Sequence, residues 1–229
     1  MNTSLLSSGI YSIPDAARLI GVHAARLRWW VCGGGAGDYS RPLIKRDLPV
    51  VDHQIALSFV NLIEARFIAA FASHGVHVRS IRIMAEEAQQ MLGTEHPFAK
   101  DGMFRTDGKK IYLATVKRTK DRKLYDLKTR NWAMPQILAQ GLKTGVEFSV
   151  NGLARTWYPR KTIAPSVSVS PVVAFGQPAL HNSGVPTVAI HDALLAEEMD
   201  YGNVARWFEI TVDQVKQAEK FEASIRTVH

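Results

Sequence analysis

The sequence predicts an α+β fold that is mainly helical. Three observations predict it: two short helix patterns separated by a glycine near the start, long apolar runs of helical period in the first half, and a helical pattern opened by a capping box near the end. Two turn signals between strand-like runs add the β component. With 229 residues, 46% of them apolar and 21% charged, the chain has the composition of a globular protein.

We predict four units along the chain. Residues 1–54 form a winged helix-turn-helix unit, residues 55–95 a helical dimerisation hairpin, residues 96–165 a small middle module containing β-hairpins, and residues 166–229 a C-terminal three-helix domain. The formal net charge is +7, with six basic and three acidic residues in 1–50, fourteen and five in 101–165, but four and eight in 166–229. The basic first and middle parts suit a polyanionic partner.

The sequence also predicts a cytoplasmic protein with no role in a membrane. Cys32 is the single cysteine, which excludes an intramolecular disulfide and a cysteine-based zinc site. The first residues after Met1 are polar and do not form a signal peptide. The longest strongly apolar stretch, residues 67–72, is far short of the roughly 18 to 20 residues that a membrane span needs.

The first unit carries the pattern of a DNA-binding helix-turn-helix. Ser12 and Asp15 form a capping box that opens a helix, Pro14 occupies its first turn, and Gly21 allows the left-handed turn before a second helix that runs to about Val31. Seven residues are small or apolar where two steeply crossed helices must approach; an ordinary helical hairpin is the alternative. These residues are Ala16, Ala17, Ile20, Gly21, Val22, Leu27 and Trp30.

The outer face of the second helix is the predicted DNA-contacting surface. Arg26 and Arg28 are the main contacts, and for Arg28 we favour a phosphate over a base edge. The following residues 41–46 and 50–51 are expected to pair as the two strands of a wing along the DNA backbone. The glycine-rich residues 33–37 follow a helix and lack the ending of a phosphate-binding loop, so they indicate a hinge and no nucleotide cofactor. The full DNA-binding set is His23, Ala24, Ala25, Arg26, Arg28, Arg41, Lys45 and Arg46.

Residues 11–22, Tyr-Ser-Ile-Pro-Asp-Ala-Ala-Arg-Leu-Ile-Gly-Val, resemble the opening of the MerR-like winged-helix family. The resemblance implies a dimeric DNA-binding unit. A dimer also fits the next segment, in which apolar residues recur at helical spacing up to residue 71 and a second helix ends at Gly93. The predicted homodimer interface consists of Phe59, Leu62, Ile63, Phe67 and Phe71, and the alternative is that they form the core of a monomer.

The middle module contains two turn signals, residues 105–109 around Asp107-Gly108 and residues 149–153 around Asn151-Gly152, each predicting a hairpin. Between them, residues 117–128 include six Lys or Arg. This basic segment could contact DNA phosphates, bind an acidic partner, or be a solvated loop. Residues 160–171 are expected to connect to the last unit and to contain at most an edge strand.

The last unit is predicted to hold three helices, in residues 190–199, in 204–208, and after the capping box Thr211 to Gln214. Residues 175–179, 184–188, 204–208 and 210–215 resemble the small domain of VapB-type antitoxins, over about residues 171–223. Together with His96-Pro97-Phe98-Ala99 and Thr106-Asp107-Gly108, the whole chain is similar to long VapB-type antitoxins of toxin-antitoxin modules. Near Pro186, VapB-type antitoxins usually have an Arg and an Ile, whereas this chain has Gly184-Val185.

The resemblance implies an antitoxin that neutralises a PIN-domain-like RNase toxin and binds operator DNA to repress its own operon. Such a protein needs no catalytic residues, metal or cofactor, and the scattered histidines show no ligand spacing. Arg226 is a candidate to contact the toxin's carboxylate cluster. The alternative is a stand-alone MerR-like regulator that senses a ligand in an apolar pocket lined by Trp132, Trp157 and Tyr158, although these aromatic residues are more typical of a plain core.

Overall fold

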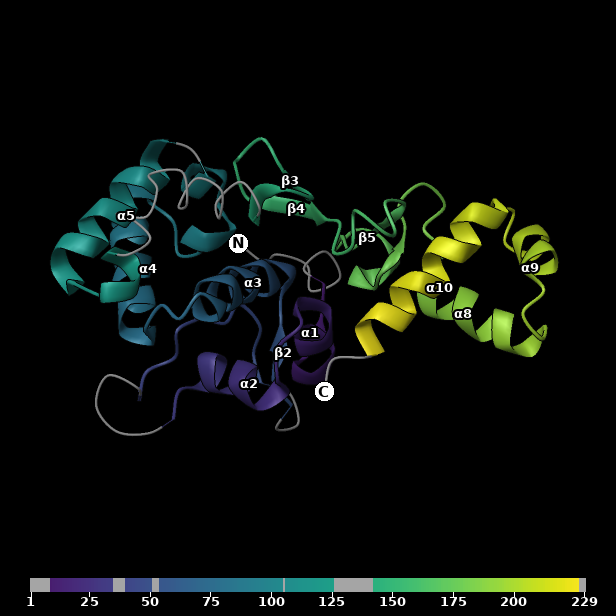
Figure 1. Ribbon diagram of the computed structural model, residues 1–229, viewed down its shortest axis with the longest axis horizontal. Helices are drawn as coiled ribbons and strands as arrows, with labels where there is room; N and C mark the ends of the chain where they lie inside the picture. Colours follow the sequence, from purple (N-terminus) through teal and green to yellow (C-terminus); the bar gives the residue numbers. More distant parts are fainter. Residues whose placement is uncertain (1–8, 35–39, 51–53, 105, 126–141, 227–229) are drawn as a thin grey trace.

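The computed structural model describes residues 9–34, 40–50, 54–104, 106–125 and 142–226. The fold is α+β and mainly helical, as the sequence predicts. Figure 1 shows an elongated molecule with helices α1 to α5 at one end and α8 to α10 at the other, joined by small two-stranded sheets. The β-containing middle joins the two helical ends, which also meet where α1 contacts α10.

The first two helices form where the local signals place them. The strand β1 (Tyr11–Ser12) leads into α1 (Ile13–Ile20), and Ser12 Oγ accepts a hydrogen bond from the Asp15 amide at 3.2 Å. Gly21 adopts φ 79°, and its N–H donates to the Ala17 carbonyl at 2.9 Å. A glycine suits this left-handed turn because it has no Cβ. The chain then enters α2 (Ala24–Cys32).

Helix α3 (Phe59–Ser73) is the centre of the larger end. Ser58 caps it by accepting a hydrogen bond from the Asn61 amide at 3.1 Å. The helix is apolar on all sides, so every face must be covered. It packs against α1, the strand β2 (Ala56–Leu57), α4 (Val78–Leu92) and the short 3₁₀ helix η3 (Pro97–Ala99), and lies among these elements in Figure 1.

The proposed dimer residues lie in the core of one chain. Phe59, Leu62, Ile63, Phe67 and Phe71 are between 0% and 5% exposed in the single chain. Phe67 stacks on Phe71 and on Phe98 of η3, with ring centroids 4.7 and 4.2 Å apart. Their assignment to a dimer interface is therefore wrong, because side chains of the same chain already cover them. A homodimer through another surface stays a prediction.

A helix replaces the first hairpin predicted for the middle module. The 3₁₀ helix η4 (Asp101–Phe104) is followed by α5 (Thr106–Thr119), which packs against α4. Gly108 has no positive φ. A Cβ on this residue would lie 1.9 Å from the Met103 carbonyl oxygen, so glycine permits a close backbone approach here and does not form a turn. The basic segment 117–128 begins at the end of α5, and residues 126–128 lie outside the described part.

The strands form three antiparallel pairs. β1 pairs with β2, β3 (Val146–Phe148) with β4 (Ala154–Trp157), and β5 (Val167–Ser168) with β6 (Ala179–Leu180). The second pair confirms the hairpin predicted around residues 149–153. The strand pair expected as a wing is wrong for residues 41–50, which form turns and bends, while residues 51–53 lie outside the described part.

The C-terminal unit contains three helices in the predicted order. After the 3₁₀ helix η5 (Ala174–Gly176), they are α8 (Thr187–Ala196), α9 (Tyr201–Trp207) and α10 (Val212–Arg226). The capping box forms, since the Gln214 amide donates to Thr211 Oγ1 at 3.2 Å and the Thr211 amide donates to Gln214 Oε1 at 2.9 Å. Val215, Ala218 and Phe221 are completely buried, so α10 forms the core of this unit.

Truncating Phe67 tests the assignment of α3 to a monomer core. We expect Phe67→Ala to lower the free energy of unfolding by about 3 to 5 kcal/mol, as for other large-to-small core changes, with no change in molecular mass by light scattering. The control Met91→Ala, at an exposed position on α4, should change stability by less than about 0.5 kcal/mol. Dissociation of an oligomer by Phe67→Ala would contradict this assignment.

Candidate nucleic-acid interface

The packing of α1 on α2 determines which face of α2 meets solvent. Ala16 and Ala17 are 0% and 2% exposed, which lets the two helices approach closely. Leu27 and Trp30 on α2 are equally buried. The helix therefore has one buried face and one free face, as a helix that enters a DNA groove requires.

Most of the predicted DNA-contacting residues of α2 lie on the free face. His23, Ala25, Arg26 and Arg28 are exposed, and Ala24 is half-buried. The first turn of α2 contains no acidic residue, and the His23 side chain accepts no hydrogen bond from its amides. The amides at a helix N-terminus carry partial positive charge. This end of α2 therefore favours an anion such as a DNA phosphate.

His23 and Arg26 also line an open groove of roughly 690 Å³ between α2 and α3. Arg66, Ala69 and Ser73 of α3 form its other wall. Arg28 is not among the lining residues and projects from a different part of the free face. The structure thus separates the two arginines that the sequence predicts as main contacts.

Residues 40–50 hold three further predicted contacts beside α2. Arg41, Lys45 and Arg46 are exposed. The segment is fixed to α2 because the Leu43 amide donates to the Trp30 carbonyl at 2.7 Å. It is fixed to α4 because the guanidinium of Arg82 donates to the Arg41 carbonyl at 2.7 Å. Helices α1 and α2 with residues 40–50 are called the head below.

One of these three basic residues is already engaged. Lys45 Nζ makes an ion pair with the Glu95 carboxylate. Both side chains are more than half exposed, so the pair is weak and can exchange for a phosphate. Arg41 and Arg46 make no ion pair with another described residue.

The turn after α2 is fixed by its glycines. Gly33 has φ 71°, and a Cβ on it would lie 2.3 Å from the Ser40 carbonyl oxygen. The Nε1 of Trp29 donates to the Gly34 carbonyl at 2.7 Å, so Trp29 is the tryptophan that packs on a flanking segment. Of the predicted hinge, residues 33–37, the last three lie outside the described part.

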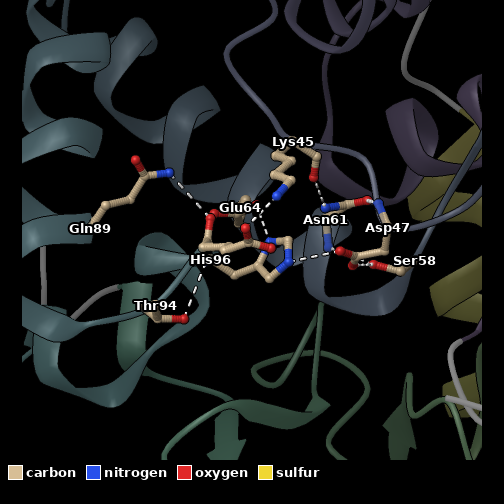
Figure 2. Close-up of polar contacts among 9 residues, drawn as sticks. Lys45, Asp47, Ser58, Asn61, Glu64, Gln89, Thr94 and His96 are labelled. Carbon is tan, nitrogen blue, oxygen red and sulfur yellow. Dashed lines mark hydrogen bonds and ion pairs between the residues drawn. The ribbon is translucent and has the colours of Figure 1, made fainter. Parts of the chain in front are cut away.

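An ion triad that includes the buried carboxylate of Glu64 connects the head to the helices behind it (Figure 2). The His96 ring lies between two carboxylates: Nε2 is 2.7 Å from Asp47 Oδ1, and Nδ1 is 3.0 Å from Glu64 Oε2. Asp47 Oδ2 also accepts a hydrogen bond from Ser58 Oγ at 2.5 Å. Asn61 Nδ2 donates to the Lys45 carbonyl at 2.8 Å, and the Asp47 amide donates to Asn61 Oδ1. These bonds join residues 45–47 to α3 and to the residue that precedes η3.

The charges in the triad stabilise one another. Burial alone would lower the pKa of His96, but its hydrogen bonds and charge contacts with Asp47 and Glu64 outweigh burial and raise this pKa to about 10. Both ring nitrogens then carry protons and both donate. Burial raises the pKa of Glu64 above its usual range. The pKa of Asp47 is lowered, because its bonds to His96 and Ser58 outweigh its partial burial.

The triad is a structural link. Each ring nitrogen of His96 faces a different carboxylate, so the three side chains do not converge on one point. Among the described residues, no group of three or more His, Cys, Asp or Glu is arranged to hold a metal ion. This cluster is not among the features predicted from the sequence. Its available signal was the presence of Asn61 and Glu64 inside an otherwise apolar helix.

The chain shares its fold with a solved protein. A crystal structure of Rv2018 from Mycobacterium tuberculosis matches it with a TM-score of 0.71, over 91% of this chain and 96% of that one. The two sequences are 22% identical, and at this level the likeness shows the fold alone. No protein-family model and no curated protein matches the sequence.

The remaining predicted features belong to other parts of the chain. Arg226 is exposed at the last residue of α10. Trp157 is 2% exposed, and the Arg66 guanidinium lies 5.3 Å from its ring centroid. Trp132 lies outside the described residues. None of the helices in the described ranges is long and apolar enough to cross a membrane.

The triad predicts a specific pH dependence of stability. The folded state holds the His96 proton more tightly than the unfolded chain does. Protonated His96 therefore contributes its full stabilisation of the fold below pH 6.5, and this stabilisation disappears as the pH rises to about 10. At pH 6.5, His96→Gln should lower the free energy of unfolding by about 3 to 5 kcal/mol, because it leaves buried Glu64 without its partner.

Chemical denaturation at several pH values measures this effect. The difference between wild type and His96→Gln should shrink from pH 6.5 toward pH 10. The control His74→Gln, at an exposed position after α3, should differ from wild type by little at every pH. A difference for His96→Gln that is constant with pH would show that its charge does not stabilise the fold.

Proposed function

We propose that this protein is an operator-binding antitoxin. In this proposal the head binds operator DNA, and the chain also neutralises an RNase of the PIN-domain kind, with which it represses its own operon. The observation that carries the DNA-binding part is the free face of α2: exposed Arg26 and Arg28 on a helix fixed by the left-handed turn at Gly21.

The head supplies the two kinds of contact that DNA binding needs. Arg26 and Arg28 are in position to contact base edges or phosphates from α2. Arg41 and Arg46 lie on the neighbouring segment, which suits contacts with the sugar-phosphate backbone on one side of the groove. The triad and Arg82 fix this segment to α3 and α4, so its basic residues are held in place before DNA arrives.

The antitoxin part of the proposal rests on the sequence. Residues 171–223 resemble the small domain of VapB-type antitoxins, and the rest of the chain is similar to the long members of that class. The alternative, a regulator that senses a ligand near Trp157, has less support, because Trp157 is buried against Arg66 as a core residue. Neither role requires catalytic residues in this chain.

Arg28→Ala tests the DNA-binding face. We expect it to weaken binding to the DNA upstream of the protein's own gene by about 1 to 3 kcal/mol in a gel-shift titration, because a charged contact is lost. If Arg28 contacts a phosphate, the loss will be similar for all sequences and the salt dependence will decrease. The control Lys220→Ala removes an exposed charge from α10 and should leave the affinity unchanged. Unaltered binding by Arg28→Ala would place the DNA-binding surface elsewhere.

Co-expression with the product of the adjacent gene tests the antitoxin role. The expected result is that this product is a nuclease, that it co-elutes with the chain in size-exclusion chromatography, and that its toxicity is relieved. DNA binding without any such partner would contradict the antitoxin role and favour the stand-alone regulator.

A further inference from the structure

The far end of the C-terminal unit carries an exposed apolar surface. Four large apolar side chains there are well exposed: Leu195 by 59%, Met199 by 39%, Trp207 by 58% and Val212 by 40%. They belong to the end of α8, the turn that follows it, the end of α9 and the start of α10. Figure 1 shows that α9 and its flanking turns form the extremity of the molecule opposite to α4 and α5. This surface is called the tip.

Three of these residues lie on adjoining segments. Trp207 lies one helical turn after Asn203 on the same face of α9, and long side chains on a helix lean toward its N-terminus. The side-chain amide of Asn203 bonds to the Glu197 carboxylate, so this face of α9 borders the turn between α8 and α9. The same turn contains Met199 and directly follows Leu195.

The turn keeps an exposed apolar residue in an unusual conformation. Glu198 and Met199 adopt φ 47° and φ 70°, in the left-handed region that favours glycine. The Met199 amide donates to the Leu194 carbonyl at 2.8 Å, which holds this conformation. The turn is therefore ordered before any partner binds, so binding would cost little conformational entropy in this turn.

Acidic residues surround the tip. Residues 192–213 contain six carboxylates and one arginine, Arg206, a net charge of −5. Five of these six carboxylate residues are exposed and the sixth, Glu197, is half-buried. Nucleic acid and anionic membranes would be repelled by this charge. A second copy of the tip would bring like charges together, which is also unfavourable. The tip therefore matches a protein surface that is basic around an apolar centre.

We propose that the tip is the surface through which this chain docks onto the basic RNA-binding surface of the RNase. This inference rests on the proposed function and adds the docking site to it. An RNase must carry basic residues where it holds the phosphates of its substrate. An acidic tip bound there competes directly with RNA, so docking itself inhibits the enzyme.

The tip is distinct from the Arg226 contact that the sequence suggested. Val212 and Arg226 are the first and last residues of α10, and a helix of this length separates them by about 21 Å. Arg226 lies at the end of α10 nearer to α1, as Figure 1 shows. Variants at the two positions can therefore be tested independently.

The test is the affinity of the full-length chain for the adjacent-gene nuclease, with the nuclease's catalytic carboxylates neutralised. Trp207→Ala should raise the Kd at least about tenfold, as for an aromatic residue at the centre of an interface. Glu198→Lys should raise the Kd and weaken its dependence on salt, because attraction to a basic surface is screened by salt. The control Met91→Ala, with a side chain 46% exposed on α4, should leave the Kd unchanged. A single-stranded RNA oligonucleotide should compete with the wild-type chain.

Operator binding and the thermal unfolding midpoint report whether each variant folds. If Trp207→Ala is destabilised, the Kd of Glu198→Lys tests the docking surface instead. The tip is not the docking site if both variants bind the nuclease as tightly as wild type, or if RNA binds the complex without competing. Either result would leave the antitoxin role intact. If the variants lose a self-association that the wild-type chain shows without nuclease, the tip binds a second copy, and the docking proposal is wrong. A wild-type chain that does not bind the nuclease at all would instead remove the proposed function, and the tip with it.

Discussion

The structure depends on the burial of one helix, α3, which is apolar on all sides. Such a helix is stable only if other elements cover most of its surface. Here α1, α4 and η3 do so, and Ala69, Ala70 and Ser73 remain along the groove beside α2. Two polar residues within it determine how the covering elements are arranged. Asn61 and Glu64 are buried and must be hydrogen-bonded, which they achieve with the Lys45 carbonyl and with His96. The position of the head therefore follows from the polar requirements of α3.

This arrangement places a basic surface and an acidic surface on different parts of an elongated chain. The head presents Arg26, Arg28 and Arg46 to solvent, and the tip presents carboxylates around Trp207. A basic surface attracts acidic partners, and an acidic surface attracts basic ones. The proposed division, with DNA at the head and a basic protein at the tip, lets one chain bind both at once and explains why the charge is so unevenly spread.

Much of the local structure could be predicted from the sequence, because short-range signals determine it. The capping boxes at Ser12 and Thr211 and the left-handed Gly21 act within four residues. The errors arose where distant residues decide the outcome. Gly108 allows the backbone to approach Met103 closely and does not form a turn. The periodicity of α3 could not show that its apolar residues would be covered by the same chain. The triad joins residues 47, 64 and 96, which no local pattern connects.

Amide hydrogen exchange with and without the upstream DNA shows directly whether the free face of α2 and the adjoining segment hold the DNA. If they do, we expect new protection in peptides covering residues 22–32 and 40–50. Peptides covering α9 and its flanking turns should exchange at unchanged rates. Protection at the tip without protection in α2 would contradict the account, because the acidic end of the molecule would then be the DNA-binding end.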